Sequence, residues 1–189
     1  MAINLKESFR VSAPPDKVWE FLLDPYQVVL CMPGTELNEV VGDDTFLGSI
    51  KVRVGPITAT YRGKAQFAEV DKQTYCIRIV AEGIEAGGGN ARGAMVSRLQ
   101  ALPDGGTEVW AEATAEISGR VMQFGRGMVQ GISKELFQEF ARNVTQRLET
   151  PAAAGAAPTS QRPINAVALA IGYIWSVVVR FLRRLFGRR

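Results

Sequence analysis

The side chains that most often carry catalysis and metal binding are scarce in this sequence. It contains no histidine, so the commonest general base and the commonest metal ligand are both missing. Its two cysteines, Cys31 and Cys76, cannot complete a four-ligand metal site and do not form a Cys-x-x-Cys pair. Among ionisable residues, strand alternation turns Tyr61 and Tyr75 inward, and no carboxylate pair is spaced for acid–base chemistry. These residue types argue against an enzyme and against a metal centre.

The two thiols also bear on the cellular compartment. The first residues, MAINLKESFRV, contain no apolar run of the kind that forms a secretory signal. We therefore expect a reducing cytoplasm, in which Cys31 and Cys76 are free and buried. The sequence alone leaves a disulfide between them open.

The inward positions of the predicted strands are unusually small. Protein interiors pack as densely as organic crystals, so something must fill the space above a face of small residues. Either the long helix lies very close to this face, or an apolar ligand occupies the space, which is the interpretation we favour. The small inward residues are Ala59, Gly63, Ala65, Ala81, Gly93, Ala111, Ala113 and Ala115.

The elements that would position these residues follow from the hydrophobic patterning. Residues 3–11 alternate as a strand, and two short helices follow, one ended by Pro25 and one closed by Pro33-Gly34. Further segments alternate with period two, which is typical of an antiparallel sheet with one wet face. They cover residues 49–54, 57–67, 75–81, 91–102 and 107–118. A long helix follows at 121–148. This order of elements predicts an α+β fold: a curved antiparallel sheet, made of the first strand and five or six later strands, wraps around the long helix.

The start of the long helix carries Gly125, Gly127 and Gly131. Each interior glycine costs about 1 kcal/mol of helix stability relative to alanine. Two interpretations stay open: a loosened segment that approaches the sheet closely or gates the interior, or a helix that begins only after Gly131. The neighbouring Met122 and Met128 would adapt to an irregular ligand, because thioethers fill gaps well.

Charge and composition divide the chain at Thr150. Residues 1–150 hold 16 basic and 19 acidic residues, whereas the rest holds six arginines and no acidic residue. Residues 151–163 are rich in Ala and Pro and predict a flexible linker. A basic isoelectric point ordinarily suggests nucleic acid. Here the arginines adjoin a long apolar run, so we expect anionic lipid and no nucleic acid.

Residues 164–189 predict an amphipathic, membrane-anchoring helix. Residues 164–179 are uncharged and five arginines follow. Sixteen helical residues span about 24 Å, short of a hydrocarbon core of roughly 30 Å. Arg-rich flanks stay on the cytoplasmic side, and the folded domain before the helix is expected there too. A helix with both ends on one side lies in the plane of the membrane. The alternatives are a helix that spans the membrane and a helix that docks on a protein. We expect a peripheral or monotopic protein at the cytoplasmic face of the cell membrane. The predicted membrane-binding residues are Ile171, Trp175, Val178, Arg180, Leu182, Arg183 and Arg184.

Several motifs resemble those of a known superfamily. The predicted first helix resembles that of the START-like, or polyketide cyclase-like (SRPBCC), superfamily. The residues that carry this resemblance are Ala13-Pro14, Val18-Trp19, Leu22 and Asp24-Pro25. The CoxG family of carbon monoxide dehydrogenase subunits resembles the chain more specifically. The motifs concerned are Cys31-Met32-Pro33-Gly34, Lys51–Pro56, Tyr61-Arg62-Gly63 and the glycine-rich Ala86–Gly93. The resemblance covers about residues 1–150.

The resemblance implies a helix-grip fold with a deep cavity between the sheet and the long helix. It also implies a partner, a molybdenum hydroxylase-type dehydrogenase that passes electrons to the membrane. This chain would anchor that enzyme and supply a respiratory quinone of the menaquinone or ubiquinone type, with no covalent cofactor. Two alternatives stay open: a polyketide cyclase-like enzyme, and a purely structural membrane-recruitment factor with a solid core.

Patterning and resemblance together predict a non-catalytic protein that binds an apolar ligand. On the wet face of the sheet, Arg53, Arg62 and Lys64 either dock an acidic partner or form an ordinary solvated surface. The predicted ligand-binding residues are Val29, Met32, Ala59, Tyr61, Met95, Ala111, Ala113, Met122, Phe124, Met128 and Ile132.

Overall fold

The computed structural model describes residues 2–150, which belong to one compact unit. The linker and the anchoring helix predicted for residues 151–189 lie outside the described residues. In chain order the elements are β1 (Ala2–Val11), α1 (Pro15–Leu23), α2 (Pro25–Cys31), β2 (Thr35–Val41), β3 (Thr45–Val54), β4 (Ile57–Asp71), β5 (Cys76–Glu85), β6 (Asn90–Ala101), β7 (Thr107–Ile117), the 3₁₀ helix η1 (Arg120–Phe124) and α3 (Gly125–Glu149).

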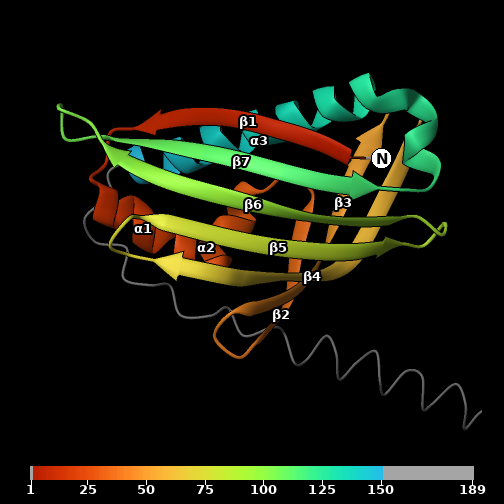
Figure 1. Cartoon of the computed structure of the whole chain (residues 1–189), viewed down its shortest axis with the longest axis horizontal. Helices are drawn as coiled ribbons and strands as arrows, with labels where there is room; N and C mark the ends of the chain where they lie inside the picture. Colours follow the sequence, from red (N-terminus) through yellow and green to blue (C-terminus); the bar gives the residue numbers. More distant parts are fainter. Residues whose placement is uncertain (1, 151–189) are drawn as a thin grey trace, which may run out of the picture. The chain divides into compact units, whose positions relative to one another are not determined.

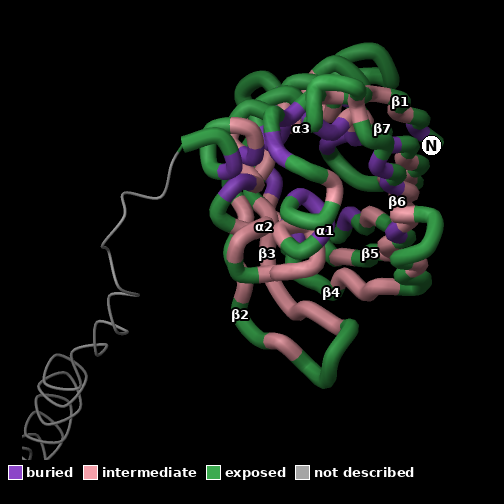
Figure 2. Tube along the Cα trace, turned by 90° about the vertical axis from the view of Figure 1, so that its left-hand side faces the viewer, coloured by how far each residue is buried: buried purple, intermediate pink, exposed green. Residues whose placement is uncertain are grey.

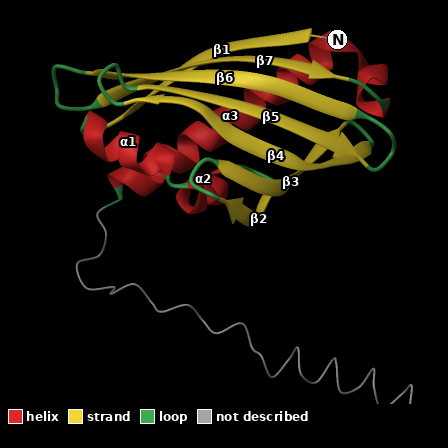
Figure 3. Cartoon of the chain, turned by 60° about the horizontal axis from the view of Figure 1, so that its bottom comes forward, coloured by secondary structure: helices red, strands yellow, loops and turns green. Residues whose placement is uncertain are grey.

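Within residues 2–150, one antiparallel sheet contains seven strands in the order β1-β7-β6-β5-β4-β3-β2. The sheet is strongly curved, and all three α-helices lie on the same side of it (Figure 3). We call the side toward α3 the inner face and the opposite side the outer face. This arrangement confirms the predicted helix-grip architecture.

The helix α3 follows the edge strand β1 (Figure 1). Its polar side chains bond to backbone carbonyls of that strand: the Gln130 amide donates to Asn4 at 3.3 Å, and the Thr145 hydroxyl donates to Arg10 at 3.4 Å. The inward residue Phe9 stacks edge-on against two rings of the helix, with centroids 6.0 and 6.4 Å away. The helix therefore closes one edge of the sheet.

The two short helices begin and end as their prolines dictate. Pro15 occupies the first turn of α1, where a missing N–H is tolerated. Between the helices, the Asp24 carboxylate accepts hydrogen bonds from the backbone N–H of Tyr26 at 2.9 Å and of Gln27 at 3.3 Å, which caps α2. The inner residue Val18 is fully buried, which contributes roughly 1.5–3 kcal/mol.

Buried apolar residues form two separate clusters rather than one core. The far end of the β2–β3 hairpin, in contrast, is exposed or half-buried (Figure 2). The larger cluster, which we call the α1–α2 core, joins the short helices to the C-terminal half of α3. Its buried members are Val11, Ala13, Val18, Trp19, Cys31, Ile77, Leu99, Val109, Phe140, Val144 and Leu148. The smaller, the η1 core, lies at the start of α3. Its buried members are Ile3, Val54, Ala59, Tyr61, Val121 and Val129.

The structure corrects the predicted start of the long helix. Residues Arg120–Phe124 form a 3₁₀ turn, and α3 begins at Gly125 rather than at Val121 or after Gly131. Gly125 has a φ of +77°, a conformation that glycine adopts without strain. A Cβ placed on Gly127 or Gly131 would meet nothing within 4 Å, so these glycines do not mark a close approach to the sheet.

Three smaller expectations change as well. The strand β2 is an addition, because periodicity does not predict it. Both cysteines are free, as expected, but only Cys31 is buried, whereas Cys76 is half-buried. Tyr75 packs against the α1–α2 core, but it lies in the turn before β5 rather than on a strand, at a φ of +50°. Its hydroxyl donates to the Asp16 carboxylate at 2.8 Å, and the Lys72 ammonium lies 4.7 Å from its ring centroid.

Two glycine substitutions test the curvature of the sheet. A Cβ on Gly63 would lie 1.9 Å from the Glu82 carbonyl oxygen of the neighbouring strand. We expect Gly63→Ala to lower the free energy of unfolding by about 1–3 kcal/mol, because the two backbones must separate. The matched change is Gly131→Ala, at a position with open space around it. This change should raise the free energy of unfolding by up to about 1 kcal/mol. Urea unfolding of both variants measures this, and equal effects would contradict it.

Candidate functional site

The inner face of the sheet carries two rows of small residues across its middle strands. In one row, Gly48, Gly63, Gly83 and Ala91 stand opposite one another on β3 to β6. In the next row, Ala65, Ala81, Gly93 and Ala115 do the same on β4 to β7. We call them the small-residue rows. Their alignment across strands is set by register and could not be read from any single strand.

The glycines and alanines of these rows are small for different reasons. A Cβ on Gly63 would meet the neighbouring backbone at 1.9 Å, and one on Gly93 would lie 2.5 Å from the Thr114 carbonyl oxygen. These glycines let the strands bend against each other. Ala81, in contrast, is exposed although it faces inward. Ala81 also lines a hollow on the outer face, and alanine side chains leave more room on the inner face than larger residues would.

The middle of the inner face belongs to neither core. Five inner-face residues, which we call the central zone, are absent from the packing of both clusters: Leu5, Ala81, Met95, Ala113 and Ala115. All except Ala81 are half-buried. The backbone of α3 approaches β1 more closely than any other strand. The structure thus has two packed ends and a loosely filled middle.

The helix presents a partly exposed apolar stripe beside its buried one. Met128 is 46% exposed, and Ile132 and Leu136, at positions four and eight further on, are half-buried. Side chains at this spacing lie on one face of a helix. Buried Val129, Phe140 and Val144 lie on the adjacent stripe. A flexible methionine in such a place can adjust to a ligand.

The predicted ligand-binding residues fall into three groups. Met95 and Ala113 pair across strands in the central zone. Ala59, Tyr61, Phe124 and Ile132 pack in or against the η1 core, with half-buried Met122 on η1 and exposed Met128 on α3. At the other end, Met32 packs against the α1–α2 core, Val29 is half-buried on α2, and Ala111 is only 4% exposed. The structure brings the first two groups close to the small-residue rows and leaves the third in packed surroundings.

The structure places two carboxylates on the inner face that the sequence analysis did not select as site residues. Glu7 faces α3 and pairs with the Lys134 ammonium at 3.3 Å. Glu85, whose side chain is 4% exposed, accepts from the Arg120 guanidinium at 2.6 Å. Continuing the strand alternation to these positions would have found both, but their partners come from η1 and α3. Neither carboxylate is free to act as a base.

The environment of Glu85 shifts two ionisations. The Arg120 guanidinium, helped by backbone N–H groups of Gly87 and Gly89, lowers the pKa of Glu85 below its ordinary value of 4.5. Burial, and secondarily the Glu85 charge, raises the pKa of Tyr61. Glu85 therefore stays ionised and ties the β5–β6 turn to η1.

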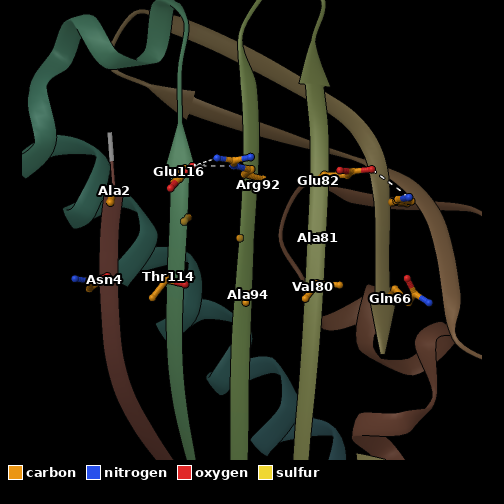
Figure 4. Close-up of a pocket in the computed structure, with 13 residues that line it drawn as sticks. Ala2, Asn4, Gln66, Val80, Ala81, Glu82, Arg92, Ala94, Thr114 and Glu116 are labelled. Atoms are coloured by element: carbon orange, nitrogen blue, oxygen red, sulfur yellow. Dashed lines mark hydrogen bonds and ion pairs between the residues drawn. The ribbon is translucent and has the colours of Figure 1, made fainter. Parts of the chain in front are cut away.

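Two hollows lie on the outer face of the sheet and are open to solvent, with volumes of about 580 and 960 Å³. Figure 4 shows the smaller one. Cross-strand ion pairs line them, Lys64 with Glu82 at 3.1 Å and Arg92 with Glu116 at 2.6 Å. Charges alternate along this face, so Lys64 and its exposed neighbours Arg53 and Arg62 resemble an ordinary solvated surface rather than a basic patch.

Residues 2–150 hold neither a metal-binding cluster nor a helix suited to crossing a membrane. No three acidic or cysteine side chains come together as ligands for a metal ion in this part of the chain. No helix within the same residues is long and apolar enough to cross a membrane.

The curved sheet, the pair of short helices after β1 and the long final helix define a START-like, or SRPBCC, protein with a helix-grip fold. Solved structures share the fold at low sequence identity. A conserved protein from Geobacillus kaustophilus is 20% identical with a TM-score of 0.71, covering 77% of this chain and 95% of its own. The ZhuI aromatase/cyclase from Streptomyces sp. R1128 is 18% identical with a TM-score of 0.61, covering 82% and 99%.

Within that superfamily, the chain matches the model of the carbon monoxide dehydrogenase CoxG family over residues 8–149. It belongs to this family. A truncated norcoclaurine synthase from Thalictrum flavum shares the fold more distantly, at 15% identity and a TM-score of 0.55 over 79% of this chain and 95% of its own. The comparison with curated proteins found no match.

The Glu85 pair predicts a pH dependence of stability. Because its pKa is lower in the folded protein than in the unfolded chain, Glu85 stabilises the fold above about pH 4.5, and this contribution disappears as the pH falls through the lowered folded value. We expect Glu85→Gln to be less stable than the wild type at pH 7, with a difference that shrinks toward pH 3. Chemical unfolding at several pH values measures it. Glu139→Gln, on the exposed surface of α3, is the control, and a difference independent of pH would contradict the prediction.

Proposed function

We propose that this chain is a non-catalytic binding protein for an apolar ligand, a respiratory quinone of the menaquinone or ubiquinone type, and that it links a molybdenum carbon monoxide dehydrogenase-type enzyme to the cytoplasmic membrane. The observation that supports the ligand is the central zone: small and flexible residues face inward between two packed cores and stay partly exposed. Native interiors seldom leave apolar residues so poorly packed.

The kind of ligand follows from the lining. Leu5, Met95 and Ala113 offer apolar surface, and the nearby carboxylates Glu7 and Glu85 are neutralised by Lys134 and Arg120. An uncharged, elongated apolar molecule matches such a surface. The same pairing supports a binding role over the cyclase-like alternative, because a paired carboxylate lacks the freedom of a general base.

The partner and the membrane are supported by family and sequence. The family is named as a subunit of carbon monoxide dehydrogenase, which suggests such an enzyme as the partner. The apolar run 164–179 with the arginines after it suggests anchoring at the anionic cytoplasmic leaflet. A protein that holds a quinone at the membrane surface would carry electrons from a cytoplasmic dehydrogenase into the membrane pool.

Filling the central zone tests the ligand. Ala113 faces inward on β7, whereas Ala94 on β6 lines a hollow on the outer face. We expect Ala113→Leu to weaken uptake of a short-chain naphthoquinone by about tenfold, because the added carbons occupy ligand space. Ala94→Leu adds the same atoms outside and should bind like the wild type. Native mass spectrometry after lipid extraction measures uptake, and a wild-type protein that binds no quinone would sink the proposal.

Charge removal tests the anchor. Each arginine near anionic lipid contributes about 1 kcal/mol to membrane binding. We expect the triple change of Arg180, Arg183 and Arg184 to Gln to reduce binding to phosphatidylserine-containing vesicles by roughly 100-fold. The matched control changes Arg62, Arg78 and Arg98 of the sheet to Gln and removes the same charge from an exposed surface. Vesicle co-sedimentation of the full chain compares them, and equal losses would refute a specific anchor.

A further inference from the structure

One row of the inner face is polar rather than small. Thr35, Ile50, Tyr61 and Glu85 stand opposite one another on β2, β3, β4 and β5. Each lies two residues along its strand from the first small-residue row or from Leu37 beside it, so this row borders that row directly. We call it the polar row.

Two hydroxyl groups of the polar row lack partners. The Thr35 hydroxyl oxygen is buried and makes no hydrogen bond. Tyr61 is 9% exposed, and no other residue within 2–150 bonds to its phenol oxygen, which unlike the Thr35 oxygen keeps contact with solvent. Buried polar groups in native proteins are almost always paired, so the Thr35 hydroxyl is the exception that needs a partner. One buried unpaired hydroxyl and one unpaired phenol at the solvent boundary, on the same row beside the central zone, indicate a site for an oxygen atom of a ligand.

The rest of the row defines what kind of oxygen fits. The Glu85 carboxylate already accepts from Arg120, and backbone N–H groups of Gly87 and Gly89 satisfy it further. Because Arg120 is engaged by Glu85, the row offers no unpaired cation to a carboxylate or phosphate head. Neutral hydroxyls donate readily to a carbonyl and accept from a hydroxyl. The row therefore suits a neutral, oxygen-bearing head.

We propose that the polar row binds the carbonyl-bearing ring of the ligand through the hydroxyls of Tyr61 and Thr35, and that the apolar chain of the ligand lies along the small-residue rows. Thr35 and Tyr61 project from strands about 10 Å apart, on the same face, with the apolar side chain of Ile50 between them. A flat ring placed there meets a donor on each side and an aliphatic floor. The inference rests on the proposed quinone function and specifies which end of the interior holds the head.

Two ligands that differ only in the head test this subsite. The full-length protein is titrated with a naphthoquinone bearing a short isoprenoid chain, and with an isoprenoid hydrocarbon of the same chain length, both followed by native mass spectrometry. We expect Tyr61→Phe to weaken the quinone about 2- to 10-fold, the loss of one neutral hydrogen bond, and to leave the hydrocarbon unchanged. Thr35→Val should act in the same direction. Tyr26→Phe makes the same chemical change at a residue that is 63% exposed and should alter neither ligand.

The outcomes separate the subsite from the function. A wild type that binds neither ligand refutes the quinone function and the subsite with it. A wild type that binds the quinone, with Tyr61→Phe and Thr35→Val binding it equally well, overturns the subsite alone. Equal weakening of quinone and hydrocarbon also overturns it, because the substitution then acts on the pocket as a whole.

A stability measurement guards against a purely structural role. Removing an orphaned hydroxyl costs the ligand-free protein no hydrogen bond, so Tyr61→Phe and Thr35→Val should keep or raise the unfolding midpoint. A lowered midpoint for both would show that the hydroxyls have partners without ligand, and would overturn the assignment. If one variant fails to fold, the other still carries the test.

Discussion

An edge strand exposes a line of unpaired backbone groups, and β1 is such a strand on the side away from β7. The long helix α3 covers this exposed side of β1. Gln130 and Thr145 bond to carbonyls of β1, Lys134 pairs with Glu7, and Phe9 stacks on rings of α3. The buried side chains of the helix reach the middle strands only within the two cores, one at each end of the sheet. The central zone between these cores is the part of the inner face that neither cluster includes.

The curvature of the sheet makes this arrangement workable. Gly63 and Gly93 let adjacent backbones approach closely, so the far strands bend toward the helices without a helix packed on them. Stability then comes from the two ends. At one end, Trp19 and the ring of Tyr75 stack edge-on at 5.5 Å, which fastens α1 to the β4–β5 turn. At the other, Arg120 and Glu85 fasten η1 to the β5–β6 turn. These contacts at both ends hold the sheet and the helices together around the central zone.

The sequence predicted most of the fold because strands with one wet face alternate strictly, and because prolines delimit the short helices. It missed β2, where a bulge between Leu37 and Glu39 breaks the alternation. It misplaced the helix start, because nothing local distinguishes a 3₁₀ turn before Gly125. For the site, residue size pointed to Ala81 and Ala113. The glycines are small because neighbouring strands touch there, whereas the alanines leave room on the inner face. Which of the two applies at a position depends on the register between strands, which a single strand does not reveal. The partners of Glu7 and Glu85 are likewise tertiary contacts without a local pattern.

The charge arrangement of the interior supports the binding role proposed above. The inner-face carboxylates Glu7 and Glu85 each pair with a cation from a helix, so these ion pairs join the sheet to α3 and η1. What remains facing the interior is apolar surface and neutral hydroxyls. Such a lining offers a neutral amphiphile hydrophobic contact along its length and hydrogen bonds at one end, and it stabilises no developing charge. A site of this kind would hold and release its ligand unchanged, which fits the carrier role that we propose.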